Sequence, residues 1–275
     1  MQKMMGLVRR CIEDYAMIVP GERIAVGVSG GKDSLVLLQI LAGLREYMDF
    51  SLDAVTIDMG LGMDYAPIAD MCKKLDMPYH IINTQIGPII FDHRKEKNPC
   101  SMCAKMRRGA LNQALLDKGF NKLALGHHYD DVVQTVLLSM FYEGQYKTMM
   151  PKVMSDNWEG MELIRPLYMV REEHIIEWQN EMGLDCLRCA CKVTKSEDGG
   201  KRKYIKDLIE KLSEDNSKLK NNIFASLTSV DLDTVLDIAD LPGTYLRTAR
   251  CDDFKKPEVQ RQAADNLRKL GIDAL

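Results

Sequence analysis

The sequence predicts an α/β fold in which helices cover a doubly wound, mostly parallel sheet. Two observations support this prediction. Short apolar stretches alternate with longer amphipathic segments along the first half of the chain, which is the pattern of strands joined by helical crossovers. A strand at 23–28 also runs into the glycine turn 29–34, which opens the next amphipathic segment. Because such sheets bind ligands at the carboxyl ends of their strands, that edge is where a functional site is expected.

The elements are expected in order along the chain. An amphipathic N-terminal helix, from about residue 3 to 16, ends before Pro20-Gly21. Apolar runs predict strands, and 3.6-residue periodicity predicts helices. The expected strands are 23–28, 52–57, 78–83 and 122–125, and the expected helices are 33–47, 64–75, 103–118, 130–142 and 171–182. A less regular stretch follows at 144–161, and the end, 221–275, is polar and helical in parts.

Composition limits the class of protein. The chain has 275 residues, of which 46% are hydrophobic and 28% charged, so it can bury a sizeable core. No apolar run approaches the ~18 residues of a membrane span, and no signal-peptide core precedes Cys11. A cytoplasmic location without membrane attachment is therefore expected. In that reducing compartment the eight cysteines indicate metal ligands or reactive thiols rather than disulfides.

Charge is unevenly distributed. The net charge of −3 argues against a wholly basic nucleic-acid binder. Six basic residues against one acid nevertheless lie between Arg94 and Arg108, and a second cluster joins Lys201-Arg202-Lys203 with Lys206. Such patches can bind a phosphate backbone, although solvated helix faces have the same composition.

The turn Ser29-Gly30-Gly31-Lys32-Asp33-Ser34 carries the strongest chemical signal. A glycine turn at a helix N-terminus exposes backbone amides to a phosphate, and the serine and lysine side chains add donors. It is not a Walker A loop, because Asp33 stands where Ser or Thr should follow Gly31-Lys32. The turn therefore predicts phosphate binding of another kind.

Cysteines carry the second signal. Cys100-x-x-Cys103 and Cys186-x-x-Cys189, followed by Cys191, each place two thiolates within reach of one metal centre. Two pairs can form a four-thiolate zinc site, whereas three thiolates can hold an iron–sulfur cluster with one open iron. The residues alone slightly favour zinc, since four-cysteine sites are common.

The glycine turn resembles the signature of the PP-loop, or N-type, ATP pyrophosphatases, which have a HUP-like fold. Further motifs follow in order: Cys100-x-x-Cys103, Leu125-Gly-His-His-Tyr-Asp-Asp131, Gln134-Thr135, Met140-Phe-Tyr, Pro151-Lys152 and Ile164-Arg-Pro-Leu167. Together they resemble the tRNA 2-thiocytidine synthetase family, TtcA, over about residues 1–215. The related uridine thiolases carry terminal Cys-x-x-Cys pairs that this chain lacks, and lysidine synthetases lack the cysteines.

The resemblance implies ATP-dependent replacement of oxygen by sulfur at carbon 2 of a tRNA cytidine, at position 32. ATP adenylates the oxygen, Mg²⁺ neutralises the departing pyrophosphate, and sulfur held by a [4Fe–4S] cluster displaces AMP. A sulfur donor such as a cysteine desulfurase is implied, and a homodimer is expected because dimers occur among resembling proteins. The alternatives are a PP-loop thiolase for another tRNA base or a small molecule, and a non-catalytic ATP-binding Fe–S or zinc protein that binds RNA.

Site residues follow from the same match. Lys32, Asp33, Asp130 and Asp131 are the expected catalytic residues. The expected ATP-binding residues are Ser29, Gly30, Gly31, Lys32, Asp33, Ser34, Asp58, Gly126 and His127. The expected cluster ligands are Cys100, Cys103 and Cys186, with Cys189 as fallback, and the expected RNA contacts are Arg107 and Arg108. For Asp130 an N-cap function explains the residue without any chemistry, although its place beside the expected ATP favours a functional residue. For Asp58 strand-end turn chemistry explains the residue as simply as a contact with ribose or adenine.

The C-terminus departs from the family pattern. Cys251-Asp-Asp-Phe254 matches the tail of better-known members only loosely, and the segment 227–250 is inserted or diverged. The expected organisation is therefore a PP-loop domain with the cluster site at 1–215 and a diverged extension at 216–275.

Overall fold

The structure is a computed structural model that describes residues 2–94, 99–155, 157–187 and 200–229. The helices are α1 Gln2–Asp14, α2 Lys32–Leu44, α3 Ala66–Lys74, the short α4 Ile86–Pro88, α5 Pro99–Asp117, α6 Tyr129–Glu143, α7 Glu172–Met182, α8 Gly200–Asp215 and α9 Leu219–Ala225. A π-helical segment, Ile89–Arg94, follows α4. The strands are β1 Glu22–Gly27, β2 Phe50–Asp58, β3 Tyr79–Asn83, β4 Lys122–Ala124, β5 Lys152–Met154 and β6 Glu162–Ile164.

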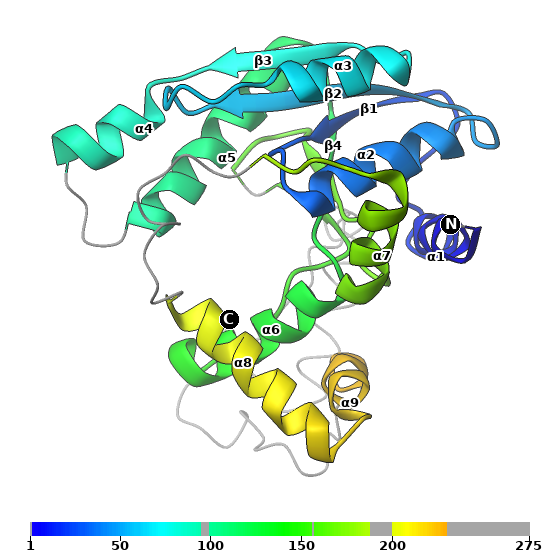
Figure 1. Ribbon diagram of the computed structural model, residues 1–275, viewed down its shortest axis with the longest axis vertical. Coiled ribbons are helices and arrows are strands. Elements are labelled where there is room, and N and C mark those ends of the chain that lie inside the picture. Colours follow the sequence, from blue (N-terminus) through cyan, green and yellow to red (C-terminus); the bar gives the residue numbers. More distant parts are fainter. Residues whose placement is uncertain (1, 95–98, 156, 188–199, 230–275) are drawn as a thin grey trace, which may run out of the picture. The chain divides into compact units, whose positions relative to one another are not determined.

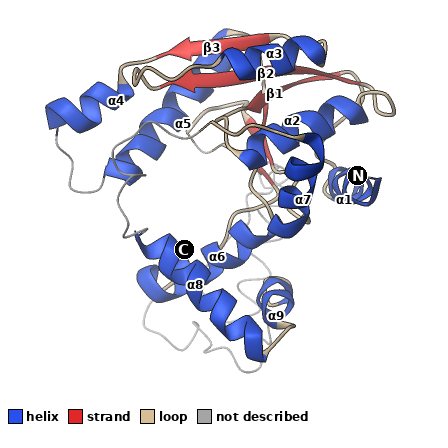
Figure 2. Ribbon diagram, in the orientation of Figure 1, coloured by secondary structure: helices blue, strands red, loops and turns tan. Residues whose placement is uncertain are grey.

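The strands form one six-stranded sheet in the order β3-β2-β1-β4-β6-β5. Figure 2 shows β3, β2 and β1 side by side. Every neighbouring pair is parallel except β5 with β6, so the prediction of a mostly parallel α/β sheet is confirmed. β1 lies between β2 and β4, and the order reverses beside it. The glycine turn follows β1 and therefore lies at the topological switch point, where ligands of open α/β sheets bind.

Helices pack on both faces of the sheet. On one face Ile24 and Val26 of β1 join the main core with apolar side chains of α1, α2, α3 and α7. On the other face Ala25 and Val55 pack with Leu115 of α5. Alternate strand residues thus enter opposite layers, as the two-residue period of a strand requires.

The 144–161 stretch is more regular than expected. It contains β5, which pairs antiparallel with β6 and forms the sheet edge. Each of these strands has three residues, too few for a hydrophobic period to show in the sequence. The helix expected at 103 begins at Pro99, so Cys100 and Cys103 both lie within α5.

Two helices follow the predicted α/β region. Ile205 and Ile209 of α8 pack on Tyr129 and Val133 of α6, and Figure 1 shows α8 across α6 with α9 beyond it. Phe224 of α9 stacks on Tyr129 with ring centroids 4.5 Å apart. The described residues up to Leu227 belong to one compact unit. The expected domain division at residue 215 stays a prediction.

Candidate functional site

The glycine turn Ser29–Ser34, hereafter the glycine loop, is closed by its own serines. Ser34 Oγ donates to the Gly31 carbonyl at 2.9 Å and accepts from the Ser29 backbone N–H at 3.1 Å. Ser29 Oγ accepts from the Gly31 N–H at 3.3 Å. Gly30 has a φ of +83°, in the left-handed region that favours glycine. These bonds fix the curvature of the loop at the N-terminus of α2, where a phosphate binds favourably.

Gly126 lies against the backbone of this loop. A Cβ at residue 126 would lie 2.9 Å from the Asp33 carbonyl carbon and 3.1 Å from the Ser34 nitrogen. Both neighbours are backbone atoms that cannot rotate away. Glycine at 126 therefore lets the segment after β4 pack directly on the loop, and the two predicted segments, 29–34 and 126–131, meet.

Lys32 lies between two carboxylates. Its Nζ is 2.8 Å from Asp33 Oδ1 and 2.9 Å from Glu172 Oε1 at the start of α7. Burial lowers the pKa of Lys32, but the two carboxylates outweigh it and raise the pKa above its ordinary value. Lys32 is therefore a fixed cation beside the loop.

Glu172 is the central residue of this charge network. Its second oxygen lies 2.9 Å from Lys206 Nζ of α8. Burial raises the pKa of Glu172, but Lys206 and Lys32 oppose it and bring the pKa to about 2. Glu172 thus joins α8 to the glycine loop.

His128 and Asp131 begin α6 beside the loop. Asp131 Oδ2 accepts from the backbone N–H of His128 at 3.2 Å, which caps the helix. His128 Nε2 lies 3.5 Å from Asp131 Oδ2 and 3.8 Å from Asp33 Oδ1. Asp131 Oδ1 also pairs with Arg202 of α8 at 3.2 Å. The predicted catalytic residues Asp33 and Asp131 are therefore brought together around a histidine that the prediction left out.

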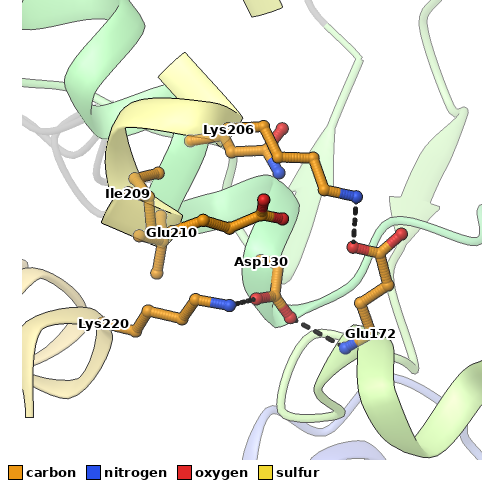
Figure 3. Close-up of a pocket in the computed structure, with 8 residues that line it drawn as sticks. Asp130, Glu172, Lys206, Ile209, Glu210 and Lys220 are labelled. Atoms are coloured by element: carbon orange, nitrogen blue, oxygen red, sulfur yellow. Dashed lines mark hydrogen bonds and ion pairs between the residues drawn. The ribbon is translucent and has the colours of Figure 1, made fainter. Parts of the chain in front are cut away.

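Both carboxylate oxygens of Asp130 bind groups on the neighbouring helices α7 and α9. One oxygen accepts from the backbone N–H of Glu172 at 2.7 Å, and the other pairs with Lys220 of α9 at 2.6 Å, as Figure 3 shows. It is 5% exposed. Burial raises its pKa, but the bonds from Lys220 and Glu172 lower it below the ordinary value. Asp130 thus holds the first turns of α6 and α7 together, and its catalytic assignment remains a prediction.

His127 points a polar atom into a buried environment. Its Nδ1 has no hydrogen-bond partner among the described residues. Burial, together with the positive charge of Arg165, lowers the pKa of His127 to about 4. His127 is therefore neutral at physiological pH.

Asp58 ends β2 one strand away from the loop. It accepts from the Gly60 N–H at 3.0 Å and from the Tyr65 hydroxyl at 3.3 Å, which is the turn chemistry weighed above. Burial and the Asp58 charge raise the pKa of Tyr65 to about 12, while Arg107 acts in the opposite direction. Arg107 therefore lies on the Asp58 side of the site, and Arg108 is exposed on the same helix.

Cys186 is brought to the glycine loop by the backbone. The N–H of Leu187 donates to the Gly30 carbonyl at 2.9 Å, and a Cβ on Gly30 would lie 2.8 Å from the Leu187 Cβ. The Cys186 thiol is half-buried and accepts from Gln179 Nε2 at 3.2 Å. Burial raises its pKa, and so does the nearby Asp33 carboxylate.

Cys103 lies at the same edge of the sheet. It packs against a cluster that includes Ile57 and Met59, at the carboxyl end of β2. Because β1 and β2 are parallel neighbours, Cys103 and Cys186 come from different parts of the sequence to one sheet edge. The Cys100 side chain and Cys189 lie outside the described residues. Within the described part of the chain, no three histidine, cysteine or carboxylate side chains form a metal-binding group.

Sequence reasoning missed five residues of the network: His128, Glu172, Arg202, Lys206 and Lys220. His128 stands inside a motif that was recognised, and Lys206 stands in a cluster interpreted as a basic patch. Glu172 and Lys220 carry no local signal, because only the packing of α7 and α9 brings them to the site. Every helix in the described residues is too short or too polar to cross a membrane.

Comparisons with known proteins agree with this geometry. A PP-loop domain family, ATP_bind_3, matches residues 5–189. The tRNA-cytidine(32) 2-sulfurtransferase of Pelobacter propionicus is 39% identical over 234 residues, covering 84% of this chain and 86% of the relative. The enzyme of the same name from Geobacter sulfurreducens is 38% identical over 241 residues, covering 86% and 93%.

A solved structure supports the fold. The U34-tRNA thiolase NcsA from Methanococcus maripaludis, determined with its [4Fe–4S] cluster, superposes with a TM-score of 0.67 at 21% identity and covers 84% of this chain and 79% of its own. Both sequence matches span most of the chain. The chain therefore belongs to the tRNA-cytidine(32) 2-sulfurtransferase family and has the PP-loop domain of that family.

Proposed function

We propose that this protein is an enzyme that replaces the C2 oxygen of cytidine 32 in tRNA with sulfur and consumes ATP. One observation carries the proposal: the hydrogen bond from Leu187 to Gly30 holds a half-buried thiol, Cys186, against the glycine loop. Phosphate chemistry and sulfur chemistry are therefore adjacent. Membership of the tRNA-cytidine(32) 2-sulfurtransferase family supplies the substrate class.

The first step is adenylation of the base. The C2 oxygen attacks the α-phosphorus of ATP, the bond to the β-phosphate breaks, and pyrophosphate leaves. The loop amides and Lys32 bind the phosphates and stabilise the charge on the departing pyrophosphate. Sulfur then forms a bond to C2 while the C–O bond breaks and AMP leaves, because AMP is a far better leaving group than an amide-like oxygen.

Magnesium has suitable ligands here. Asp33 and Asp131 approach the same histidine, and Mg²⁺ commonly takes one or two carboxylates together with substrate phosphates. In this assignment Asp33 and Asp131 hold the ion that neutralises the pyrophosphate. Their ion pairs with Lys32 and Arg202 would loosen as phosphate oxygens arrive.

The cysteines suit an iron–sulfur cluster. Cys103 lies beside the carboxyl end of β2 and Cys186 beside the loop that follows β1, the neighbouring strand. Cys100 lies three residues before Cys103 on α5, a spacing of about one helical turn. We assign Cys100, Cys103 and Cys186 as ligands of a [4Fe–4S] cluster, with Cys189 as the alternative third ligand. A cluster with three protein ligands has one open iron, which supplies a place to hold sulfur for transfer.

Other partners follow from the reaction. The sulfur must come from a donor such as a cysteine desulfurase. Arg107 and Arg108 on α5 follow the cysteines directly, and we assign them to tRNA phosphates near the activated base. A homodimer in the cytoplasm stays a prediction.

The test is nucleoside analysis of tRNA. Anaerobically purified protein, with ATP, Mg²⁺, a sulfide source and unmodified tRNA, should form 2-thiocytidine with one AMP and one pyrophosphate per base. Mass spectrometry of digested tRNA identifies the base and its position. A thiolated uridine would redirect the proposal to another base, and AMP formation without any thiolated nucleoside would overturn it.

A further inference from the structure

Large aromatic side chains are exposed where α6 ends and α8 begins. The exposed fractions are 56% for Phe141, 43% for Tyr142 and 60% for Tyr204. Lys201 Nζ lies 4.3 Å from the centre of the Tyr142 ring. Tyr204 lies three residues beyond Lys201, so the two share one flank of α8. These four residues, Phe141, Tyr142, Lys201 and Tyr204, are called the aromatic surface below.

The packing of α8 does not require these rings. Ile205 and Ile209 join α8 to α6 through Tyr129 and Val133. Tyr142 and Tyr204 retain large exposed fractions although α6 and α8 are in contact. Exposed aromatic side chains at two helix ends that are in contact through Lys201 and Tyr142 are available to bind a partner rather than needed for folding.

The surrounding charge identifies the class of partner. The first half of α8 carries four cations, of which Arg202, Lys203 and Lys206 pair with Asp131, Asp207 and Glu172. Lys201 lies instead over the Tyr142 ring, beside the exposed aromatic side chains. The positive end of the helix dipole lies at the N-terminus of α8 and adds to this charge. An anionic group beside Lys201, such as a nucleotide phosphate, is therefore the complementary ligand. Protein interfaces, by contrast, are depleted of lysine at their centres.

Position links the aromatic surface to the ATP site. On the same helix, Arg202 pairs with Asp131 and Lys206 pairs with Glu172, which contacts Lys32. Figure 1 shows the beginning of α8 over the end of α6. A chain of phosphates that follows the first two turns of α8 therefore leads from the aromatic surface toward the glycine loop.

We propose that the aromatic surface binds unpaired nucleotides of the tRNA substrate, with bases stacked on Tyr142, Tyr204 and Phe141 and a phosphate bound by Lys201. Aromatic rings alternating with cations are the surface on which single-stranded RNA stacks, because every base has a π-face. The proposal rests on the proposed function, which supplies the tRNA. It adds a second RNA contact, distinct from Arg107 and Arg108 on α5.

The experiment measures tRNA affinity of surface variants. Tyr142→Ala and Tyr204→Ala are compared with Tyr47→Ala, which removes a 73% exposed tyrosine in the turn after α2. The probe is an unmodified tRNA transcript with cytidine at position 32, titrated at several salt concentrations. Each surface variant should raise Kd about fivefold or more, and the double variant more still, while Tyr47→Ala changes nothing.

Salt dependence separates stacking from charge. Lys201→Ala should reduce the slope of log affinity against log salt by about 0.7 to 0.9, the contribution of one phosphate contact. The tyrosine variants should weaken binding without changing that slope. ATP should raise the melting temperature of all variants equally, since the glycine loop is untouched.

The outcomes distinguish the two proposals. If the wild type binds tRNA and every surface variant has the same Kd, the proposed RNA contact at the aromatic surface is wrong and the proposed function stands. Loss of thiolation with unchanged tRNA affinity also overturns that contact, and would point to docking of a protein sulfur donor. A wild-type protein that binds no tRNA overturns both.

Discussion

The ammonium group of Lys32 lies 2.9 Å from Glu172 Oε1, so the cation of the glycine loop is already paired before any phosphate binds. The other oxygen of Glu172 pairs with Lys206 at 2.9 Å. A single carboxylate at the start of α7 thus connects the glycine loop with α8. When ATP binds, its phosphate oxygens must replace part of the ion pair that Glu172 makes with Lys32.

Glu172→Gln is expected to lower the free energy of unfolding by about 1–2 kcal/mol at pH 7, because two partly buried ammonium groups lose their shared anion. Glu172 has a lowered pKa, so its contribution is complete above pH 4.5 and is lost as the pH falls toward 2. Urea unfolding at pH 7 and pH 3 should therefore show a smaller difference between variant and wild type at the lower pH.

ATP should rescue this variant in part. Phosphate oxygens replace the missing anion beside Lys32, so saturating ATP should raise the melting temperature of Glu172→Gln more than that of wild type. Glu173→Gln is the matched control, since the Glu173 side chain is 62% exposed and its ion pair with Arg171 is long, at 3.9 Å. Equal destabilisation by both variants would show that the Lys32–Glu172 pair has no special importance.

Iron content should distinguish the proposed ligands. Anaerobically purified wild type is expected to contain roughly four irons per chain, and Cys103→Ala and Cys186→Ala should each lose most of them. Cys72→Ala should retain iron, because Cys72 is 1% exposed in the apolar core and can only cost packing energy. Iron, sulfide and zinc are measured on the same samples.

Cys189 provides the sharper comparison. If Cys186 is the third ligand, Cys189→Ala keeps the iron. A colourless wild type with about one zinc, lost in both Cys186→Ala and Cys189→Ala, would instead establish the four-thiolate zinc site and remove the cluster from the mechanism.

Because of His127, the free energy of unfolding should fall in mild acid. Burial and Arg165 lower its pKa to about 4, from an ordinary value of 6.5. The imidazole of His127 binds a proton more readily in the unfolded chain than in the folded one. The contribution of neutral His127 to the free energy of unfolding is therefore complete above pH 6.5 and is lost as the pH falls through 4. The loss is at most about 3 kcal/mol. The unfolding free energy of wild type should therefore fall more steeply between pH 6.5 and pH 4 than that of His127→Asn.

The test is the slope of the unfolding free energy against pH rather than its absolute value, because replacing His127 with Asn also removes packing contacts. His174→Asn in α7 controls for the removal of a histidine elsewhere in the fold. Parallel pH profiles for wild type and His127→Asn would mean that His127 is not held neutral by its surroundings.

The fold was predictable where the sequence repeats a local rule. The alternation of apolar runs and amphipathic segments gave the positions of β1, α2, β2, α3 and β3 to within a few residues. The strand pair β5 and β6 was missed because three residues show no period, and its pairing with β4 depends on contacts distant in sequence.

The site was predictable only in part, for a related reason. The motifs at 29–34 and 126–131 were found, and Gly126 brings them together as expected. Nothing local separates Glu172 from Glu173, since both occupy the first turn of α7. Which of them reaches Lys32 is decided by how α7 packs on α2. Likewise, the cluster Lys201–Lys206 was interpreted as a surface patch, whereas Arg202 and Lys206 pair with Asp131 and Glu172.

Gly126→Ala should disrupt the glycine loop without introducing any polar change. The new Cβ would lie 2.9 Å from the Asp33 carbonyl carbon and 3.0 Å from its oxygen, so the loop backbone must move. We expect a loss of stability of about 1–3 kcal/mol and at least a tenfold loss of affinity for a non-hydrolysable ATP analogue, measured by urea unfolding and calorimetry. Gly109→Ala is the control, because no atom lies within 4 Å of its added Cβ and alanine favours the helix α5. If Gly126→Ala binds the analogue as tightly as wild type, contact between the two segments is not needed to shape the phosphate site, and the loop amides alone would have to account for ATP binding.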